Sequence, residues 1–205
     1  MIILEDLLQQ GNLQAAVAGL AKDFIAQNQL PDFQQIAFCV GSSEKSSQQI
    51  EQQQSTQPFL LSQAVLPVWI ERGIKKSFIG KVGIGYVDGI QIEFLETGIG
   101  SGFYGQLLSK LGETRLHHLG FFVEELKPHT DKLEQNGYPI YVIGKSIIGA
   151  VEVDFHYMDT FEELGFFIEF ICFSMDGKGF IPEQSMIEGM ALKQREKARN
   201  SCINS

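Results

Sequence analysis

Alternation of apolar and polar residues is the most regular pattern along this chain of 205 residues. A period of two places successive side chains on opposite faces of a strand, so each alternating segment is a predicted β-strand. Asp88-Gly89, between two such segments, is a strong hairpin signal. The predicted strands are 33–40, 64–71, 79–86, 90–96, 116–123, 138–143, 150–158 and 165–172.

Helical spacing occurs between and outside these strands. Residues 1–30 are predicted to be helical, because apolar residues recur at the i, i+3, i+4 spacing after Asn12, a good N-cap, and Leu30-Pro31-Asp32 ends the pattern. The polar stretch 41–57 contains one large apolar residue, Ile50, which predicts either a weak surface helix over 44–53 or a partly mobile segment. Further helices are predicted through Tyr104, Leu107, Leu108 and Leu111, over 126–136 before Gly137 and Pro139, and over 183–199.

The order of elements occurs twice. Phe33–Val40 is echoed by Leu116–Val123, and Ile92–Phe94 is echoed by Ile168–Phe170. Each copy reads as one strand, one helix and three strands. The predicted organisation is an N-terminal helical extension (1–32), a first module (33–96), a connector (97–115), a second module (116–174) and a C-terminal helical tail (175–205).

Each copy carries two metal-capable side chains at matching offsets. Gln35 matches His118, and Glu93 matches Glu169. Strand alternation places all four opposite a wholly apolar face that is suited to lie under a helix. Burial of an unpaired carboxylate costs free energy, so both glutamates need a partner, and a cation bound by all four groups would supply it. If the copies fold alike and pair, the four side chains converge on one site.

Composition narrows the class of protein. With 44% hydrophobic and 20% charged residues the chain is typical of a globular protein, and its net charge of −9 makes nucleic acid an unfavourable partner. It has no run of about 18 apolar residues, and its first residues are unlike a signal peptide, so we expect a cytoplasmic protein without a membrane span. Cys39, Cys172 and Cys202 are too widely spaced for a disulfide framework or a zinc finger, and the first two are most simply core residues.

Two local features have alternative interpretations. Arg72, Lys75, Lys76 and Lys81 form a basic cluster, either a hairpin edge protected by lysine or a handle for a substrate's distant anionic end, such as a coenzyme A phosphate or a glutathione carboxylate. Glycines at 98, 100 and 102 invite a phosphate-loop interpretation. A hinge between the modules is simpler, because no strand-to-helix nucleotide unit surrounds them.

Three segments together resemble the second half of a vicinal oxygen chelate protein: Leu116–Glu124, the Asp159-Thr160 pair and Leu164–Phe170. That superfamily includes glyoxalase I, methylmalonyl-CoA epimerase, extradiol dioxygenases and the bleomycin and fosfomycin resistance proteins. The resemblance covers residues 33–172 and implies an α+β, glyoxalase-like fold, in which paired βαβββ modules form curved sheets around a metal-containing cavity. Carried over by position, the metal ligands are Gln35, Glu93, His118 and Glu169, while His117 is expected to point to the other face.

The implied ligand set limits the chemistry. Three oxygen donors and one imidazole suit zinc, nickel, cobalt, manganese or magnesium. Iron-dependent extradiol dioxygenases resemble one another in using two histidines and one carboxylate, so oxygen chemistry is disfavoured. The set is similar to that of eukaryotic-type glyoxalase I, whereas the sequence around His118 is more similar to epimerases, which usually carry histidine where this chain has Gln35.

The resemblance implies a metal-dependent isomerase, epimerase or lyase that removes a proton next to a carbonyl. The metal would stabilise the enediolate or enolate, with Glu169 or Glu93 as the base. His156 and Tyr157 have two interpretations: one of them faces the cavity, or both are structural, and the structural role is favoured. The expected partners are a small-molecule substrate, such as a thioester or hemithioacetal, and a second copy of the chain. The modules are free either to pair within one chain or to swap between subunits.

The alternative is a non-catalytic binding or sequestering protein of the bleomycin-resistance type. A third possibility is a module that has lost its metal site and works through partners. Two glutamates favour the enzyme, because a binding module has no need of two buried carboxylates.

Overall fold

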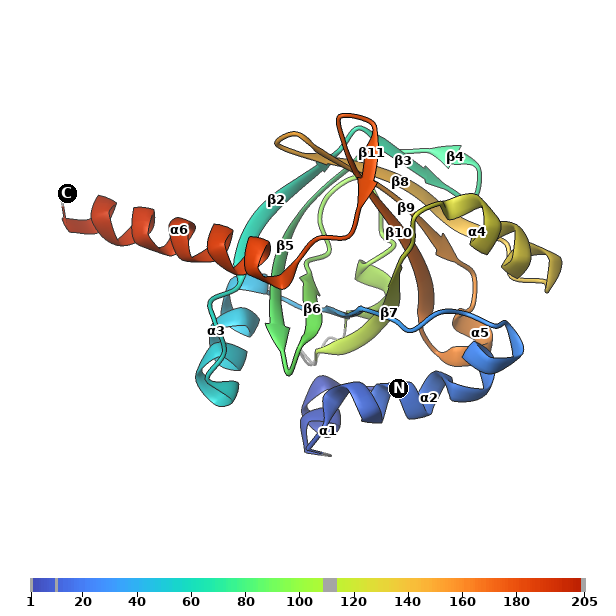
Figure 1. The fold of residues 1–205 in the computed structure, drawn as a ribbon, viewed down its shortest axis with the longest axis horizontal. Helices are drawn as coiled ribbons and strands as arrows, with labels where there is room; N and C mark the ends of the chain where they lie inside the picture. Colours follow the sequence, from blue (N-terminus) through green and yellow to red (C-terminus); the bar gives the residue numbers. More distant parts are fainter. Residues whose placement is uncertain (1, 10, 109–113, 204–205) are drawn as a thin grey trace.

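The computed structural model describes residues 2–9, 11–108 and 114–203. Its centre is one strongly curled sheet with helices around its outer side (Figure 1). The strands are β1 (Gln35–Cys39), β2 (Leu60–Leu66), β3 (Val68–Glu71), β4 (Ile74–Lys75), β5 (Phe78–Val87), β6 (Ile90–Leu95), β7 (Arg115–Phe122), β8 (Ile140–Ile148), β9 (Val151–Met158), β10 (Phe167–Met175) and β11 (Lys178–Phe180). The helices are α1 (Leu4–Leu8), α2 (Leu13–Gln27), α3 (Ser43–Gln54), the 3-10 turn η1 (Gly105–Leu107), α4 (Leu126–Gln135), α5 (Phe161–Leu164) and α6 (Gln184–Ile203).

The sheet contains the same unit twice. Strands β1, β2, β5 and β6 with α3 form the first βαβββ copy, and β7, β8, β9 and β10 with α4 form the second. In each copy the last strand runs parallel to the first, β6 beside β1 and β10 beside β7. An antiparallel pairing of β1 with β7 joins the copies within one chain. The α+β fold of paired βαβββ modules, with added helices at both ends, is therefore confirmed.

The predicted single strand 64–71 is wrong. It is two strands, β2 and β3, separated at Pro67, and they pair with different neighbours. β2 pairs with β5 at one edge of the sheet, whereas β3 pairs with β8 of the second copy. Proline has no N–H to donate to a ladder and fixes its own φ, so a continuous strand ends there. The bend carries the chain from one edge of the curled sheet to the strands of the other (Figure 1).

The two faces of the sheet differ as the alternation predicts. The outer face carries Ile36, Phe38, Leu119 and Phe121, which pack in one cluster with Leu13, Val17, Ala21 and Phe24 of α2. The inner face is also apolar and largely aromatic. This inner cluster consists of Ala37, Cys39, Leu66, Trp69, Phe78, Leu95, Phe103, Tyr104, Phe122, Val142, Val153, Phe155, Tyr157, Phe167 and Ile171. The apolar outer faces of the first strands are thus confirmed as the surface that helices cover.

The segment 1–30, predicted as helical, contains two helices, α1 and α2, because Gly11 between them has a positive φ of 78° that a helix does not allow. The other helix signals agree with the sequence. Asn12 caps α2 by accepting from the N–H of Ala15, at 2.8 Å, and the polar stretch forms a helix, α3, whose N-cap Ser42 accepts from Lys45. One core prediction is wrong, because Cys172 lies only partly buried on the outer face, where its thiol donates to the carbonyl of Glu124. No helix in the described ranges has the length and apolar character that a membrane crossing requires.

The connector between the copies runs into the interior of the curled sheet. The expected helix through Tyr104 is only the short turn η1 where the chain is described, and Leu111 lies outside those residues. Phe103 and Tyr104 are 2% and 3% exposed, and the Phe103 ring centre lies 4.8 Å from that of Phe167 and 5.9 Å from that of Trp69. Burial of two aromatic side chains stabilises this path far more than an exposed helix would.

Candidate metal centre

Four side chains from four neighbouring strands meet on the inner face. Glu93 of β6 pairs across the ladder with Ala37, two residues after Gln35 of β1. Its counterpart, Glu169 of β10, pairs with Gly120, two residues after His118 of β7. The antiparallel β1–β7 pair then sets Gln35 opposite Gly120 and His118 opposite Ala37. Because the same register is repeated on both sides of this pair, the four predicted donors lie together at the junction of the copies.

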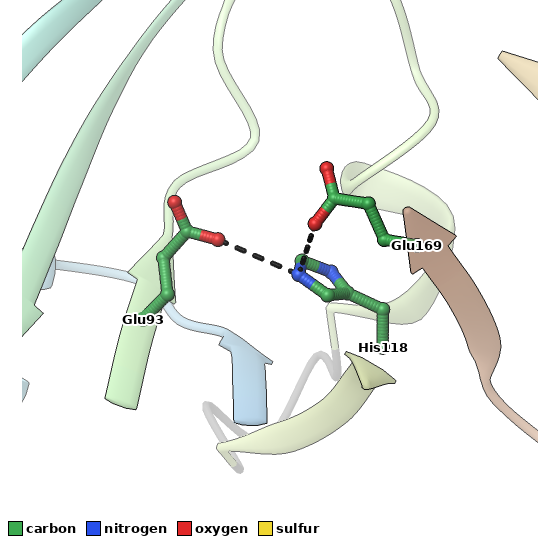
Figure 2. A group of neighbouring side chains, drawn as sticks. All are labelled: Glu93, His118 and Glu169. Carbon is green, nitrogen blue, oxygen red and sulfur yellow. Dashed lines mark ion pairs between the residues drawn. The ribbon is translucent and has the colours of Figure 1, made fainter. Parts of the chain in front are cut away.

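The distances describe a compact cluster around one imidazole nitrogen. His118 Nε2 lies 2.8 Å from Glu169 Oε2, 3.1 Å from Gln35 Oε1 and 3.5 Å from Glu93 Oε2. Figure 2 shows the two carboxylates reaching His118 from different strands, and the donor atoms of these three residues lie within 4.8 Å of one another. Gly120 leaves space for the Gln35 side chain, since a Cβ at position 120 would lie 2.6 Å from Gln35 Oε1.

Burial governs the charges of the cluster. Gln35 and Glu169 are each 4% exposed and His118 is fully buried. Burial and the neighbouring Glu169 raise the pKa of Glu93 to about 8. Burial also raises the pKa of Glu169 to about 8, although a hydrogen bond from Tyr157 opposes the shift, and burial lowers the pKa of His118 to about 3. Within the described ranges no lysine or arginine forms an ion pair with either carboxylate.

These residues fit a divalent cation. Glu169 Oε2 is buried without a hydrogen bond, and His118 Nε2 has one proton or one lone pair to offer to three surrounding oxygens. A neutral imidazole facing two acids therefore leaves the cluster short of positive charge. Two carboxylates, one amide oxygen and one imidazole form a donor set that zinc and its neighbours, or a harder ion such as manganese, accept.

His117 was expected to face the other way, and this prediction is wrong. The ladder shifts register beside it, because Ala37 pairs with His118 and Phe38 with Leu116, so His117 has no cross-strand partner. Both imidazoles consequently point inward. The Nδ1 atoms of His117 and His118 lie 2.9 Å apart, which leaves His118 Nε2 facing the carboxylates. Such a second hydrogen bond is what orients a metal-binding histidine. A bulge of this kind has no signal in the local sequence.

Three further polar side chains surround the cluster. Of the pair His156 and Tyr157, Tyr157 faces inward, and it lies directly across the ladder from Glu169. Its hydroxyl is 3.0 Å from that of Tyr104. Gln91 lies two residues before Glu93 on the same face and donates and accepts hydrogen bonds there. The strand alternation predicts that Gln91 and Tyr157 lie on the inner face, whereas nothing in the sequence predicts that Tyr104 lies beside the cluster.

A cavity of about 760 Å³ lies near the cluster but is not lined by it. Its wall includes Phe167, whose other neighbours are Phe103 and His117, so these rings separate the cavity from the carboxylates. Arg72 also lines it, 3.1 Å from Asp159 and stacked over Tyr141.

The basic cluster at the hairpin is partly neutralised. Besides the pair of Arg72 with Asp159, Lys76 lies 2.8 Å from Glu71. Lys75 belongs to β4, the last strand in the order of the sheet. This arrangement supports the interpretation as a protected edge rather than as an anion handle.

Stability of the metal-free protein is expected to fall as pH rises from 6.5 to 8. In this window Glu93 and Glu169 are ionised in the unfolded chain but still bind protons in the folded one, because their folded pKa values are raised to about 8. Stability falls with pH wherever the folded state binds more protons. The histidines, whose folded pKa values are lowered, oppose this effect near pH 6.5, where they are partly protonated in the unfolded chain, and no longer do so at the upper end of the window. We expect the melting temperature to drop by several degrees, at about 2–4 °C per kcal/mol.

Differential scanning calorimetry at several pH values, after treatment with a chelator, measures this effect. The Glu169→Gln variant should show a shallower dependence, because one of the two acids is then absent. A melting temperature that rises or stays level from pH 6.5 to 8 would contradict the predicted proton uptake.

Comparison with known proteins gives relatives in structure but not in sequence. No protein-family model matches the chain, and no curated protein matches it by sequence. A solved methylmalonyl-CoA epimerase in complex with methylmalonyl-CoA and NH4+ is 13% identical, over 68% of this chain and 92% of that one, with a TM-score of 0.45. A variant of the Streptomyces coelicolor methylmalonyl-CoA epimerase bound to 2-nitronate-propionyl-CoA is 12% identical, over 73% and 97%, with a TM-score of 0.47.

A variant of 4-hydroxymandelate synthase from Streptomyces coelicolor is 16% identical, over 80% of this chain and 55% of that one, with a TM-score of 0.49. These proteins are members of the vicinal oxygen chelate superfamily, the family that the sequence resembles. The likeness is one of fold.

Proposed function

We propose that this chain is a divalent-metal-dependent isomerase, epimerase or lyase that removes a proton from the carbon next to a carbonyl. One observation carries the proposal: the buried carboxylate of Glu169 and the partly buried carboxylate of Glu93, without a lysine or arginine partner in the described ranges, flank a neutral histidine. A purely structural core gains nothing from two such acids, because each costs free energy to bury. Perturbed acids in one cluster are typical of functional sites.

In this proposal Gln35, Glu93, His118 and Glu169 hold the ion. When bound, the ion would act as a Lewis acid toward neighbouring oxygens of the substrate. The residues of the chain perform the proton transfers. One carboxylate accepts the proton, the C–H electron pair moves into the carbonyl, and the acid so formed returns the proton to the same carbon or to its neighbour. Return from the opposite face by the second carboxylic acid would invert the carbon.

The surroundings suit this chemistry. Tyr157 donates a hydrogen bond to Glu169 and holds one carboxylate in place, while Glu93 is less constrained, at 3.5 Å from His118. Aromatic walls exclude water and raise the proton affinity of both acids. Within the described ranges neither carboxylate has a lysine or arginine ion-pair partner, so we propose a substrate whose reacting end is an uncharged carbonyl, such as a thioester or a hemithioacetal.

Two measurements on the wild-type protein test the proposal. Elemental analysis of protein purified without a chelator should find about one divalent ion per chain. Incubation in D2O with candidate thioesters and hemithioacetals should then introduce deuterium next to the carbonyl, as detected by NMR or mass spectrometry. Absence of bound metal even after addition of Co²⁺, Ni²⁺, Zn²⁺ or Mn²⁺ would overturn it.

A second candidate function has one observation in its favour. Phe103 and Tyr104 occupy the interior beside the metal cluster, and the carboxylates do not line the nearby cavity. A protein that binds a small molecule in that cavity without transforming it needs no access to the acids. Bound metal, together with no exchange in any candidate substrate, would favour this non-catalytic binding protein over the enzyme.

A further inference from the structure

We infer that Gln91, itself held by Tyr86, is a positioning residue that turns the amide oxygen of Gln35 toward the metal centre. The inference rests on the proposed metal site and assigns a role to a residue outside the four donors. A glutamine amide has one end that accepts and one end that donates. Only the oxygen end of Gln35 can join two carboxylates and an imidazole around a cation, so its orientation decides whether the site has four donors or three.

Three hydrogen bonds in series set this orientation. The Nε2 of Gln35 donates to Oε1 of Gln91 at 2.7 Å, and Nε2 of Gln91 donates to the hydroxyl of Tyr86 at 2.9 Å. Since the NH2 group of Gln35 is engaged by Gln91, its Oε1 is the end that points inward, 3.1 Å from His118 Nε2. Gln35 and Gln91 are each 4% exposed, so water does not compete strongly for these bonds.

These hydrogen bonds could also form with both amides turned over, so the orientation of Gln91 determines that of Gln35. If both amides turned over, the hydroxyl of Tyr86 would donate to Gln91, Gln91 would donate to Gln35, and the NH2 group of Gln35 would face the acids. Turning Gln35 alone is excluded, because two carbonyl oxygens would then meet at 2.7 Å. The orientation of Gln35 is therefore locked to that of Gln91, and the setting in the structure is the one that presents oxygen to a cation.

The backbone supports the same arrangement. Gln91 precedes the donor Glu93 by two residues on β6, and its backbone partner across the ladder is Gln35 itself. Gly120 leaves room for the Gln35 side chain on the other side. The amide of Gln35 is thus held by Gln91 on one side, while Gly120 leaves space for it on the other, as in a preorganised site.

Substitutions at Gln91 separate orientation from packing. In Gln91→Met the acceptor for Gln35 is lost at similar volume, and we expect the dissociation constant for Co²⁺, measured by competition with a chromophoric chelator, to rise about tenfold or more. In Gln91→Glu the side chain only accepts, so it can bind the Gln35 NH2 group and the Tyr86 hydroxyl, and Co²⁺ affinity should stay at or above that of the wild type. The visible absorption of bound Co²⁺ should change in the first variant and persist in the second.

Gln34→Met is the matched control. Gln34 is the adjacent glutamine and also makes two hydrogen bonds, to the carbonyl of Asp32 and from the N–H of Phe122, but away from the centre. Its replacement should lower stability without altering Co²⁺ affinity. Should Gln91→Met not fold, Gln91→Leu, which removes the same acceptor for the Gln35 NH2 group, tests the same series and should also weaken binding.

Outcomes distinguish this inference from the function on which it rests. A wild-type protein that binds no divalent ion overturns the proposed function. Wild-type binding with equal affinity and an equal Co²⁺ spectrum in Gln91→Met (or Gln91→Leu) and Gln34→Met overturns the role of Gln91 alone. A Gln91→Glu variant as weak as Gln91→Met also overturns it, because an acceptor at this position would then not be what orients Gln35.

Discussion

Replacement of His118 by alanine is expected to abolish stoichiometric binding of divalent metal. Its Nε2 is the atom around which three oxygens gather, at 2.8, 3.1 and 3.5 Å, and it is the one nitrogen donor of the proposed set. Loss of an outer hydrogen-bond partner already weakens metal binding about 10–100-fold, so loss of the ligand itself should exceed about a hundredfold. Titration with Co²⁺, followed by its visible absorption and by elemental analysis after gel filtration, measures the change.

His156→Ala is the control for this prediction. His156 lies on β9 next to Tyr157, but on the outer face beside α4, and its replacement should leave metal binding intact. Metal-free His118→Ala is also expected to remain folded, because the two acids bind protons when no cation is present. Retention of one tightly bound ion per chain in His118→Ala would show that the metal centre lies elsewhere.

The convergence of Gln35, Glu93, His118 and Glu169 could be predicted because duplication and alternation are local signals. Matching offsets place Gln35 with His118, and Glu93 with Glu169, and a period of two assigns each to a face without knowledge of the tertiary structure. The actual register adds what the sequence lacks, namely that Ala37 and Gly120 are the small partners beside which the donors converge. Prediction succeeded where one repeated pattern fixed both copies.

The failures share a physical cause, which is that they depend on contacts between distant segments. The bulge that turns His117 inward is a property of the β1–β7 ladder and not of the Leu116–Leu119 segment alone. The path of β3 depends on the free edge of β8. Phe103 and Tyr104 pack against the aromatic side chains on the inner face of the sheet, although their local sequence is compatible with a surface helix. Tertiary burial overrides weak local propensity in each case.

The site lies where the two copies meet, and this explains how the donor set became asymmetric. The β1 copy supplies an amide at the position where the β7 copy supplies an imidazole, while the last strands supply a carboxylate each. The neighbours differ in the same way, since His117 contacts His118, whereas Gln91 contacts Gln35. In each half of the duplication the first of these polar side chains therefore has its own hydrogen-bond partner.

Replacement of Glu169 by glutamine is expected to lower solvent deuterium exchange into the substrate by about 10²–10⁴-fold, the usual contribution of a general acid or base. Glutamine keeps the volume and can accept the hydrogen bond from Tyr157, but it cannot take up a proton. Metal content measured on the same samples separates the two roles of Glu169. If exchange is lost while the metal is retained, Glu169 transfers the proton. If both exchange and metal are lost, Glu169 is needed first as a metal ligand.

Glu93→Gln, in parallel, shows how the work is divided between the two acids. One acid is proposed to remove the proton and the other to return it to the opposite face of the substrate carbon. Each variant should then exchange deuterium on one face of that carbon only, or lose conversion to product while keeping part of the exchange. Glu96→Gln is the matched control, since Glu96 follows β6 directly but accepts hydrogen bonds from Ser43, at 2.9 Å, and should leave exchange unchanged. Full exchange in both Glu93→Gln and Glu169→Gln would exclude these carboxylates as the bases.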